Sequence, residues 1–290
     1  MQAIDISHFI THQQLPDTYA KFAKEWFFPL AEQLIRQQKR VKKSLVIGIN
    51  GTQGSGKSTL AELLVFLFKQ HYQINAVSLS LDDFYYTRQQ RVELANRIHP
   101  LLLTRGVPGT HDILLAQQIL DSLLQGEKIT SIPRFNKAED DRFPQDQWDT
   151  AGGKMDIVMF EGWCLGAEPQ KADDLLTPVN ELEEKYDAEL IWRKYVNQQL
   201  RGHYSTLFNT VDLWIMLKAP SFDCVFNWRL QQENKLRESI NDKSRTMDEH
   251  AIKQFIQYYQ RITEHLLVTL PNKIDYLFEL DEQRNIIRSS

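Results

Sequence analysis

A glycine-rich turn between an apolar segment and a helical segment constrains the fold of this 290-residue chain more than any other feature. Residues 45–49, Leu-Val-Ile-Gly-Ile, predict a short buried strand, and Gly-Thr-Gln-Gly-Ser-Gly-Lys-Ser follows at 51–58. An apolar helical pattern then runs from about residue 58 to residue 70. The octapeptide matches the P-loop pattern GxxxxGK[ST] and stands in the strand–turn–helix context that the motif requires. The sequence therefore predicts a phosphate-binding turn in an α/β fold.

Strands and helices alternate along the rest of the chain. Further strands are predicted at 76–81, 156–160, 213–218 and 274–280, and helices at 113–124, 186–199, 222–238 and 248–270. This alternation predicts a P-loop three-layer sandwich, in which helices cover both faces of a mostly parallel sheet and a helical lid adjoins it. Residues 17–38 add a helical pattern that Pro29 kinks or divides. We therefore divide the chain into an N-terminal helical extension, 1–43, and a P-loop domain, 44–290.

Composition and charge argue against several classes of protein. Hydrophobic residues make up 42% and charged residues 25%, which is ordinary globular usage. The 34 basic and 38 acidic residues leave a net charge of -4, which disfavours nucleic-acid binding by bulk charge. The basic residues at 39–43 are expected at a solvated helix end, with a nucleic-acid contact as the alternative. Cys164 and Cys224 suggest neither a disulfide framework nor a thiolate metal site.

The sequence also leads to an expectation about the compartment. The longest apolar run, residues 63–68, is far shorter than a membrane span, and the N-terminus lacks the pattern of a secretory signal. We expect a cytoplasmic protein that binds a small molecule, and neither a membrane nor nucleic acid. The sequence does not indicate an oligomeric state.

The residue types of the P-loop suit a nucleoside triphosphate and Mg²⁺. Glycines let backbone N–H groups turn inward around phosphate oxygens, and the following helix N-terminus favours negative charge. Lys57 supplies a cation for the outer phosphates, and the Ser58 hydroxyl is a ligand for Mg²⁺. The alternative is a glycine-rich hairpin or helix cap that binds nothing. The predicted nucleotide-binding residues are Gly51, Thr52, Gln53, Gly54, Ser55, Gly56, Lys57, Ser58 and Thr59.

Acidic residues stand at the ends of two predicted strands. Glu161 follows the carboxyl end of one, and Asp156 stands at its opposite end, roughly 16 Å away at about 3.3 Å per residue. Only Glu161 is therefore expected to face the phosphates and their metal. Asp82 and Asp83 follow the other strand, and a carboxylate there can accept the proton of a substrate hydroxyl. Because successive side chains of an extended chain point opposite ways, only one of the two is expected to face the cleft, and we predict Asp82 as the base. The alternative is that Glu161, Asp82 and Asp83 cap loops and turns.

Six segments, taken in order, resemble the plant and fungal type of D-glycerate 3-kinase, which belongs to the P-loop kinases related to uridine kinase and phosphoribulokinase. The likeness runs from about residue 45 to residue 280. It implies an ATP- and Mg²⁺-dependent kinase that transfers the γ-phosphate to a hydroxyl of a small hydroxy acid. The first candidate for this acceptor is D-glycerate, through its 3-hydroxyl. The segments are the P-loop, Leu-Asp-Asp-Phe-Tyr at 81–85, Arg-Gly-Val-Pro-Gly-Thr-His-Asp at 105–112, Pro-Arg-Phe-Asn-Lys at 133–137, Glu-Gly-Trp-Cys-Leu-Gly at 161–166 and Trp-Arg-Leu-Gln-Gln-Glu at 228–233.

The resemblance also implies roles for individual residues. The general base of the wider group falls on Asp82, and the family's strand-end glutamate falls on Glu161. The segments at 105–112 and 133–137 correspond to the surroundings of the acceptor pocket. In the second of these, Phe and Asn replace the usual Tyr and Asp at 135 and 136, which leaves the acceptor open. Residues 245–248, Arg-Thr-Met-Asp, replace an expected Gly-Met-Ser-Asp.

A hydroxy-acid acceptor carries a carboxylate, which calls for a fixed cation. The predicted substrate-binding residues are Asp83, Tyr85, Arg105, His111, Asp112, Arg134, Lys137 and Arg142. The alternatives are ordinary surface charges, a buried helix-entry histidine at 111 and a helix N-cap at 112.

A group of basic residues between 229 and 245 is predicted to belong to the lid. Mobile lids commonly bring positive charge to a transferred phosphoryl group. The group consists of Arg229, Lys235, Arg237, Lys243 and Arg245. Arg229 belongs to the resembling segment, so we predict it as catalytic together with Lys57 and Asp82; the alternative for the others is a solvated helix face.

Two short strings resemble motifs of GTPases, Asp-Thr-Ala-Gly at 149–152 and Asn-Lys-Ile-Asp at 272–275. The first precedes a predicted strand instead of following one, and the second opens a strand at the wrong edge of the sheet. These positions argue against a GTPase. If the protein is not an enzyme, the alternative is a non-catalytic nucleotide-binding or GTPase-like module. Within enzymes, the alternative is another metabolite kinase of the same fold, with uridine, pantothenate or a sugar phosphate as acceptor.

Overall fold

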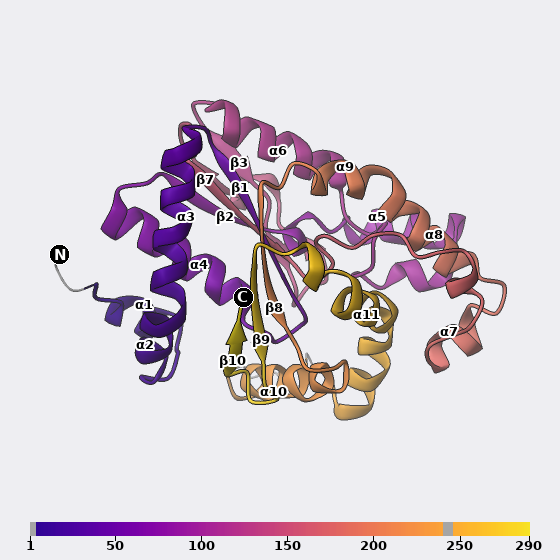
Figure 1. Cartoon of the computed structure of the whole chain (residues 1–290). Helices are drawn as coiled ribbons and strands as arrows, with labels where there is room; N and C mark the ends of the chain where they lie inside the picture. The colour runs from indigo at the N-terminus through magenta and orange to yellow at the C-terminus, as the bar shows by residue number, and fades with distance from the viewer. Residues whose placement is uncertain (1–3, 240–245) are drawn as a thin grey trace.

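The computed structural model describes residues 4–239 and 246–290. Within them, a six-stranded sheet has the order β10-β9-β8-β1-β7-β2. β1 pairs in parallel with both β7 and β8, whereas β10 pairs antiparallel with β9. The mostly parallel sheet between two helical layers confirms the predicted α/β sandwich (Figure 1). The strands are β1 (Leu45–Gly51), β2 (Ala76–Ser80), β7 (Ile157–Gly162), β8 (Leu213–Lys218), β9 (Tyr276–Leu280) and β10 (Ile286–Ser289).

Side chains that alternate along the strands form a separate hydrophobic core on each face of the sheet. In β1, Ile47 and Ile49 belong to one core, and Val46 belongs to the other. The first core includes α1 (Ser7–His12), α3 (Phe28–Val41) and α4 (Lys57–Tyr72). The second includes α6 (Ile113–Gln125), α8 (Ile191–Gln199), α9 (Ser205–Phe208) and α11 (Glu249–Thr269). Figure 1 shows α3 and α4 on the opposite side of the strands from α6, α9 and α11.

Residues 19–41 stay helical, and the helix changes its type just before Pro29 instead of being divided there. A π-helical turn, Ala23–Phe27, joins α2 (Tyr19–Phe22) to α3, and Pro29 lies in the first turn of α3. A proline lacks the N–H that would bond to the preceding turn, so a helix that continues through it adjusts locally, here by a π-helical turn. The Phe27 ring centroid lies 5.9 Å from that of Phe278 in β9, so these helices pack directly on the sheet. The division of the chain at residue 43 stays a prediction.

The prediction of one helix over residues 186–199 is wrong. α7 (Glu181–Tyr186) ends before Asp187, and α8 begins at Ile191. The Asp187 carboxylate accepts hydrogen bonds from the backbone N–H groups of Trp192, at 2.8 Å, and Arg193, at 3.1 Å. Leu190 adopts a left-handed conformation with φ 63°. The side chain of Asp187 thus caps a new helix where the apolar pattern alone suggests continuity.

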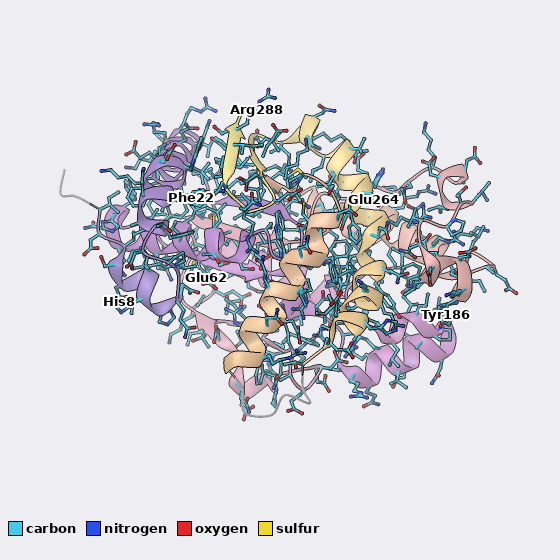
Figure 2. All side chains as sticks on the ribbon, turned by 90° about the horizontal axis from the view of Figure 1, so that it is seen from below. His8, Phe22, Glu62, Tyr186, Glu264 and Arg288 are labelled. Carbon is cyan, nitrogen blue, oxygen red and sulfur yellow. The ribbon has the colours of Figure 1, made fainter. Side chains whose placement is uncertain are left out.

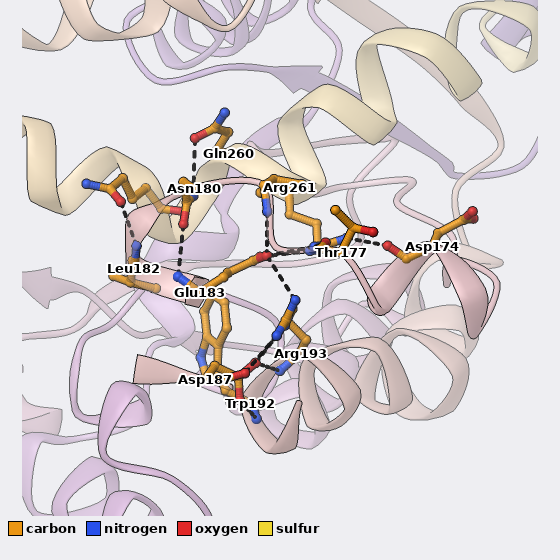
Figure 3. Close-up of polar contacts among 12 residues, drawn as sticks. Asp174, Thr177, Asn180, Leu182, Glu183, Asp187, Trp192, Arg193, Gln260 and Arg261 are labelled. Atoms are coloured by element: carbon orange, nitrogen blue, oxygen red, sulfur yellow. Dashed lines mark hydrogen bonds and ion pairs between the residues drawn. The ribbon is translucent and has the colours of Figure 1, made fainter. Parts of the chain in front are cut away.

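A buried ion network joins α7, α8 and α11 (Figure 3). The Glu183 side chain is fully buried, and its two carboxylate oxygens lie 2.7 and 2.6 Å from Nε and Nη2 of Arg261. Arg193 lies 3.6 Å from Glu183 and donates to Asp187 from Nε at 2.8 Å. Because each charge has an opposite partner and hydrogen bonds, the cost of burying it is offset. The network holds the segment that follows β7 against α11.

Several short elements carry no periodic signal and were not predicted. α5 (Arg88–Arg97) begins with a capping box formed by Thr87 and Gln90. Two antiparallel pairs form small separate sheets, and β10 is the edge strand of the main sheet. The pairs are β3 (Thr130–Ile132) with β6 (Asp149–Ala151), and β4 (Phe135–Asn136) with β5 (Asp141–Arg142). By contrast, α10 (Asp223–Ser239) confirms the helix predicted at 222–238. None of the helices in 4–239 and 246–290 combines the length and the apolar character that a bilayer crossing needs.

Candidate active site

Three segments meet at the carboxyl-terminal edge of the sheet. β1 leads into the P-loop, β7 ends with Glu161 and Gly162, and β2 leads into Asp82. The strand register places Glu161 opposite Ile49 of β1 on one side and Ser80 of β2 on the other. Parallel strands bring their carboxyl ends to one edge, so the P-loop, Glu161 and Asp82 lie together as expected.

Two glycines of the P-loop have backbone conformations that other residues rarely adopt, and at Gly54 there is also no space for a side chain. Gly54 has φ +80°, and a Cβ atom there would lie 2.6 Å from Cβ of Trp228 in α10. Gly56, with φ +93°, stands directly before α4. Among the described residues, the buried hydroxyls of Thr52 and Ser55 have no hydrogen-bond partner. Buried polar atoms are normally paired, so these hydroxyls fit a loop whose partners arrive with a phosphate ligand.

Glu161 is coupled to both functional side chains at the start of α4. The Ser58 hydroxyl donates to one carboxylate oxygen of Glu161 at 2.8 Å, and Nζ of Lys57 lies 3.9 Å from the other. Glu161 is 4% exposed. Asp156 stands at the far end of β7, where its carboxylate accepts from the backbone N–H of Asn75 at 2.9 Å. The structure therefore separates the two carboxylates of this strand as the sequence predicts.

The adjacent carboxylates of Asp82 and Asp83 have different partners. Asp82 accepts hydrogen bonds from Nζ of Lys137 at 2.9 Å and from the Tyr85 hydroxyl at 3.0 Å. Asp83 accepts from Nη1 of Arg134 at 2.6 Å and from the backbone N–H of Phe135 at 3.0 Å. Asp82 and Asp83 lie in a 3₁₀ turn, Leu81–Phe84, and not in the extended chain that the prediction assumed. Asp83 ties β4 to the end of β2, and Asp82 is the carboxylate that the charge of Lys57 attracts.

The surroundings of Asp82 keep it ionised. Burial by itself raises the pKa of this carboxyl, but the ammonium groups of Lys137 and Lys57 outweigh burial and hold the pKa below its ordinary value. The same attraction to Asp82 raises the pKa of Lys137. Burial raises the pKa of Asp83 instead. At neutral pH, Asp82 is thus an anion able to accept a proton.

Each predicted cation of the acceptor pocket has a partner in the protein. Arg105 pairs with Asp140 and packs over the ring of Phe135, while Arg134 bridges Asp83 and Asp149. Lys137 pairs with Asp82. Arg142 donates to the backbone carbonyl of Tyr85 at 2.8 Å from Nη2. Among these side chains, Lys137 is the most exposed, at 65%.

His111 and Asp112 occupy the structural roles that the sequence left as alternatives. His111 is 1% exposed, its ring stacks on that of Tyr85 at 4.4 Å, and Nδ1 lies 2.6 Å from the hydroxyl of Tyr204. Burial lowers the pKa of His111 to about 3, so the ring is neutral at physiological pH. Asp112 is the N-cap of α6 and accepts from the backbone N–H of Leu115 at 3.1 Å.

Arg229 lies on α10, one residue after the tryptophan that packs on the P-loop. It forms an ion pair with Glu233, which also accepts from the backbone N–H of Met247 at 2.8 Å. Arg237 donates to the carbonyl of Met247 at 2.9 Å. Both arginines are therefore linked to the segment that leads into α11. Lys243, Arg245 and the side chain of Lys235 lie outside what the structure describes.

Three residues around the site were not found from the sequence. Asp140 pairs with Arg91 as well as Arg105, Tyr204 holds His111, and Arg284 donates to the carbonyl of Gly54 at 3.4 Å. Asp140 stands in a run of acidic residues at 139–141, which signals charge but not a partner. No local pattern marks Tyr204 or Arg284, because their partners lie 93 and 230 positions away in the chain.

The chain is similar to known kinases in both sequence and structure. An uncharacterized kinase of Schizosaccharomyces pombe is 34% identical, and the alignment covers 83% of this chain and 87% of that protein. The chloroplastic D-glycerate 3-kinase of Arabidopsis thaliana is 31% identical over 84% of this chain, and this chain spans about half of it, 54%. The solved structure of D-glycerate 3-kinase from Cryptococcus neoformans var. grubii matches with a TM-score of 0.74 and 27% identity, covering 90% of this chain and 97% of that one. No family model matches the chain.

The similarity to these kinases covers the P-loop, the ends of β2 and β7 and the helices of both layers, rather than the P-loop motif alone. Identities above 30% over more than four fifths of the chain accompany a shared fold. The chain belongs to the D-glycerate 3-kinase family of P-loop kinases.

Proposed function

We propose that the protein is an ATP- and Mg²⁺-dependent kinase that transfers the γ-phosphate to a hydroxyl of a small hydroxy acid, and that this hydroxyl is the 3-hydroxyl of D-glycerate. The observation that carries the proposal is the position of Asp82. Its carboxylate lies at the same sheet edge as the P-loop and Glu161, and Lys137 and Lys57 favour its ionised form. An ionised carboxylate beside a bound triphosphate can accept the proton of an attacking hydroxyl.

The nucleotide side of the site has a residue for each requirement of phosphoryl transfer. In this proposal, the P-loop amides and Lys57 hold the phosphates, and Arg229 exchanges its partner Glu233 for the transferred group. The orphaned hydroxyls of Thr52 and Ser55 are consistent with phosphate oxygens as their partners.

The site also suits Mg²⁺. One oxygen of Glu161 is buried without a hydrogen-bond partner among the described residues, and the Ser58 hydroxyl lies beside the other oxygen. No cluster of three or more His, Cys, Asp or Glu side chains suited to a metal occurs in the described part of the chain. That fits Mg²⁺, which usually takes few protein ligands and completes its shell with water and phosphates. When bound, the ion neutralises charge on the phosphates; Ser58 and Glu161 would hold it directly or through water.

The acceptor side is proposed around the β4–β5 pair. Lys137 and Arg134 supply cations for the substrate carboxylate, and Arg105 and Arg142 shape the pocket through Asp140 and the backbone of Tyr85. The two departures from the family pattern have structural accounts. The ring of Phe135 packs against that of Tyr85 at 5.2 Å, and the Asn136 side chain accepts from the backbone N–H groups of the following turn. Neither position supplies a charge to the acceptor, so carboxylate recognition rests on the cations.

The decisive experiment measures ADP release with D-glycerate, uridine, pantothenate and ribulose 5-phosphate as acceptors, each with ATP and with GTP. We expect turnover with D-glycerate and ATP. Turnover with a different acceptor only would show that the protein is a kinase but that D-glycerate is not its substrate. Nucleotide binding without any turnover would favour a non-catalytic module. The expected compartment stays the cytoplasm, as predicted from the sequence.

A further inference from the structure

A cleft of about 610 Å³ adjoins the P-loop on the side of the first hydrophobic core. Its volume lies within the range of about 300–1,000 Å³ that is usual for small-molecule sites. One wall is the P-loop with the start of α4, including Gly54, Ser55 and Thr59. A second wall is the β9–β10 turn, and the third is the N-terminal wall, which we define as the lining residues between positions 15 and 27. Residues from opposite ends of the chain therefore enclose one space beside the phosphate site.

The β9–β10 turn and the P-loop are joined directly. The Arg284 guanidinium lies 5.7 Å from the ring centroid of Trp228 and donates to the backbone carbonyl of Gly54. Gln283, Asn285 and Gln231 also line the cleft. Side-chain amides and a guanidinium offer donors and acceptors for the edges of a nucleobase and for ribose hydroxyls.

The N-terminal wall is aromatic and firmly attached to the sheet. The Tyr19 ring packs 6.1 Å from Phe22 and 6.5 Å from Phe27, and Phe27 in turn packs on Phe278 of β9. Figure 2 labels Phe22 among the N-terminal helices, and the side chain is only partly buried. The Tyr19 hydroxyl is buried and has no hydrogen-bond partner among the described residues. A partly exposed ring and an unpaired hydroxyl in a cleft wall are features of a binding surface.

We propose that the N-terminal wall completes the nucleoside site of the enzyme: Phe22 contacts the base or ribose of the bound nucleoside triphosphate, and the Tyr19 hydroxyl hydrogen-bonds to it. This inference rests on the proposed function, because it places the triphosphate on the P-loop. The nucleoside at the end of that triphosphate must then lie beside the loop, and the cleft is continuous with Gly54, Ser55 and Gly56. The N-terminal helices thereby contribute to nucleotide affinity, a role that no sequence pattern assigns to them.

The test compares two probes on the full-length protein, Mg²⁺–ATP and Mg²⁺–tripolyphosphate, by titration calorimetry. Tripolyphosphate occupies the P-loop but has no nucleoside, so the ratio of the two affinities reports on the cleft. Phe22→Ala should weaken ATP binding by about 5- to 150-fold, the range for loss of one base–aromatic contact, and leave tripolyphosphate binding unchanged. Tyr19→Phe keeps the ring and should weaken ATP binding by about 2- to 12-fold.

Phe28→Ala is the matched control, because Phe28 is a partly buried aromatic of the same helical region that does not line the cleft. It should leave the affinity ratio at the wild-type value. An unchanged ratio in both Phe22→Ala and Tyr19→Phe would overturn the inference, as would an equal loss in Phe28→Ala or equal wild-type affinities for the two probes. Should Phe22→Ala fail to fold, Tyr19→Phe alone decides.

Failure of the proposed function gives a different result. In that case the wild-type protein binds neither probe, or Lys57→Ala binds both as tightly as the wild type. Binding of both probes with loss of both in Lys57→Ala, but no effect of the N-terminal substitutions, removes only the present inference.

Discussion

The ammonium nitrogen of Lys137 lies 2.9 Å from a carboxylate oxygen of Asp82, and this contact joins the proposed general base to the turn that follows β4. The pair lowers the pKa of Asp82 and raises that of Lys137. Lys137 is well exposed, so an incoming substrate carboxylate can draw its side chain away from Asp82. The same lysine is thus placed to keep the base ionised and to bind the acceptor.

The first prediction concerns Asp82 itself. Asp82→Asn removes the proton acceptor but keeps the size of the side chain and the hydrogen bond from Tyr85. We expect turnover to fall by about 10²–10⁴-fold with nearly unchanged ATP affinity, measured by coupled ADP release and by calorimetry. Asp156→Asn, at the opposite end of β7, is the control and should keep full turnover. A fully active Asp82→Asn enzyme would remove this residue from the mechanism.

A second prediction uses the pH dependence of kcat/KM. The acid limb of this profile reports the pKa of the free enzyme's base. Since Lys137 lowers the pKa of Asp82, Lys137→Met should move the acid limb to higher pH and also raise the KM for the acceptor. Lys171→Met changes an exposed lysine elsewhere and should leave the profile in place. An acid limb at the wild-type position in Lys137→Met would show that the ion pair does not control the base.

A third prediction concerns the metal requirement. Glu161→Gln keeps an acceptor for the Ser58 hydroxyl but removes the charge beside Lys57. The Mg²⁺ concentration for half-maximal activity should rise by about 10- to 100-fold, as for other residues that support a metal site. Activity titrations with Mg²⁺ at saturating ATP test this, with Glu127→Gln as a surface control. Identical Mg²⁺ titrations in Glu161→Gln and the wild type would contradict the assignment of Glu161.

A fourth prediction links His111 to stability. Its pKa is lowered to about 3 by burial, below the ordinary value of about 6.5. Between these pH values the unfolded chain binds a proton that the native protein does not, so the free energy of unfolding falls as pH is lowered. The contribution is complete above pH about 6.5. Its slope approaches about 1.4 kcal/mol per pH unit, one proton, midway between the two pKa values, and declines again near the native pKa of about 3.

Denaturant unfolding between pH 7 and 5 measures this slope before most carboxylates titrate. His111→Gln should flatten it, because the substituted residue does not titrate. Tyr204→Phe, which removes the hydroxyl near Nδ1 but leaves the imidazole buried, should retain it. A wild-type slope in His111→Gln would assign the pH dependence to other groups.

A fifth prediction tests the buried network of Figure 3. Glu183→Ala leaves Arg261 without its carboxylate partner and removes one partner of Arg193. Breaking a buried pair in this way should lower the free energy of unfolding by about 3–5 kcal/mol. Glu184→Ala, the exposed neighbour, should change it by less than about 0.5 kcal/mol. Equal effects of the two substitutions would show that the network does not stabilise the fold.

The sequence was sufficient for the elements whose signals are local. The P-loop, the strands around it and the separation of Glu161 from Asp156 follow from a short motif, from apolar runs and from the two-residue period of a strand. These features depend on residues that are close in the sequence, so they can be predicted from the sequence alone. Asp82 and Asp83 do contact different partners, but they lie in a 3₁₀ turn, Leu81–Phe84, so the strand period from which the divergence was predicted is not its cause.

Local patterns were misleading where a side chain interrupts them. The helical spacing over residues 186–199 continues across Asp187, but the carboxylate of Asp187 caps the next helix and ends the pattern. The small β-pairs and β10 have only two to four residues per strand, too few for a period to appear.

The partners of the site residues came from the fold alone. Asp82 and Lys137 are 55 positions apart, His111 and Tyr204 are 93 apart, and Gly54 and Arg284 are 230 apart. Which of several similar charges meet across such distances depends on the paths of the intervening loops, and no spacing rule describes those paths. Motif and periodicity thus identify the phosphate loop and its carboxylates, whereas the pairing of the cations and the N-terminal wall of the cleft arise only when distant segments pack on the same sheet.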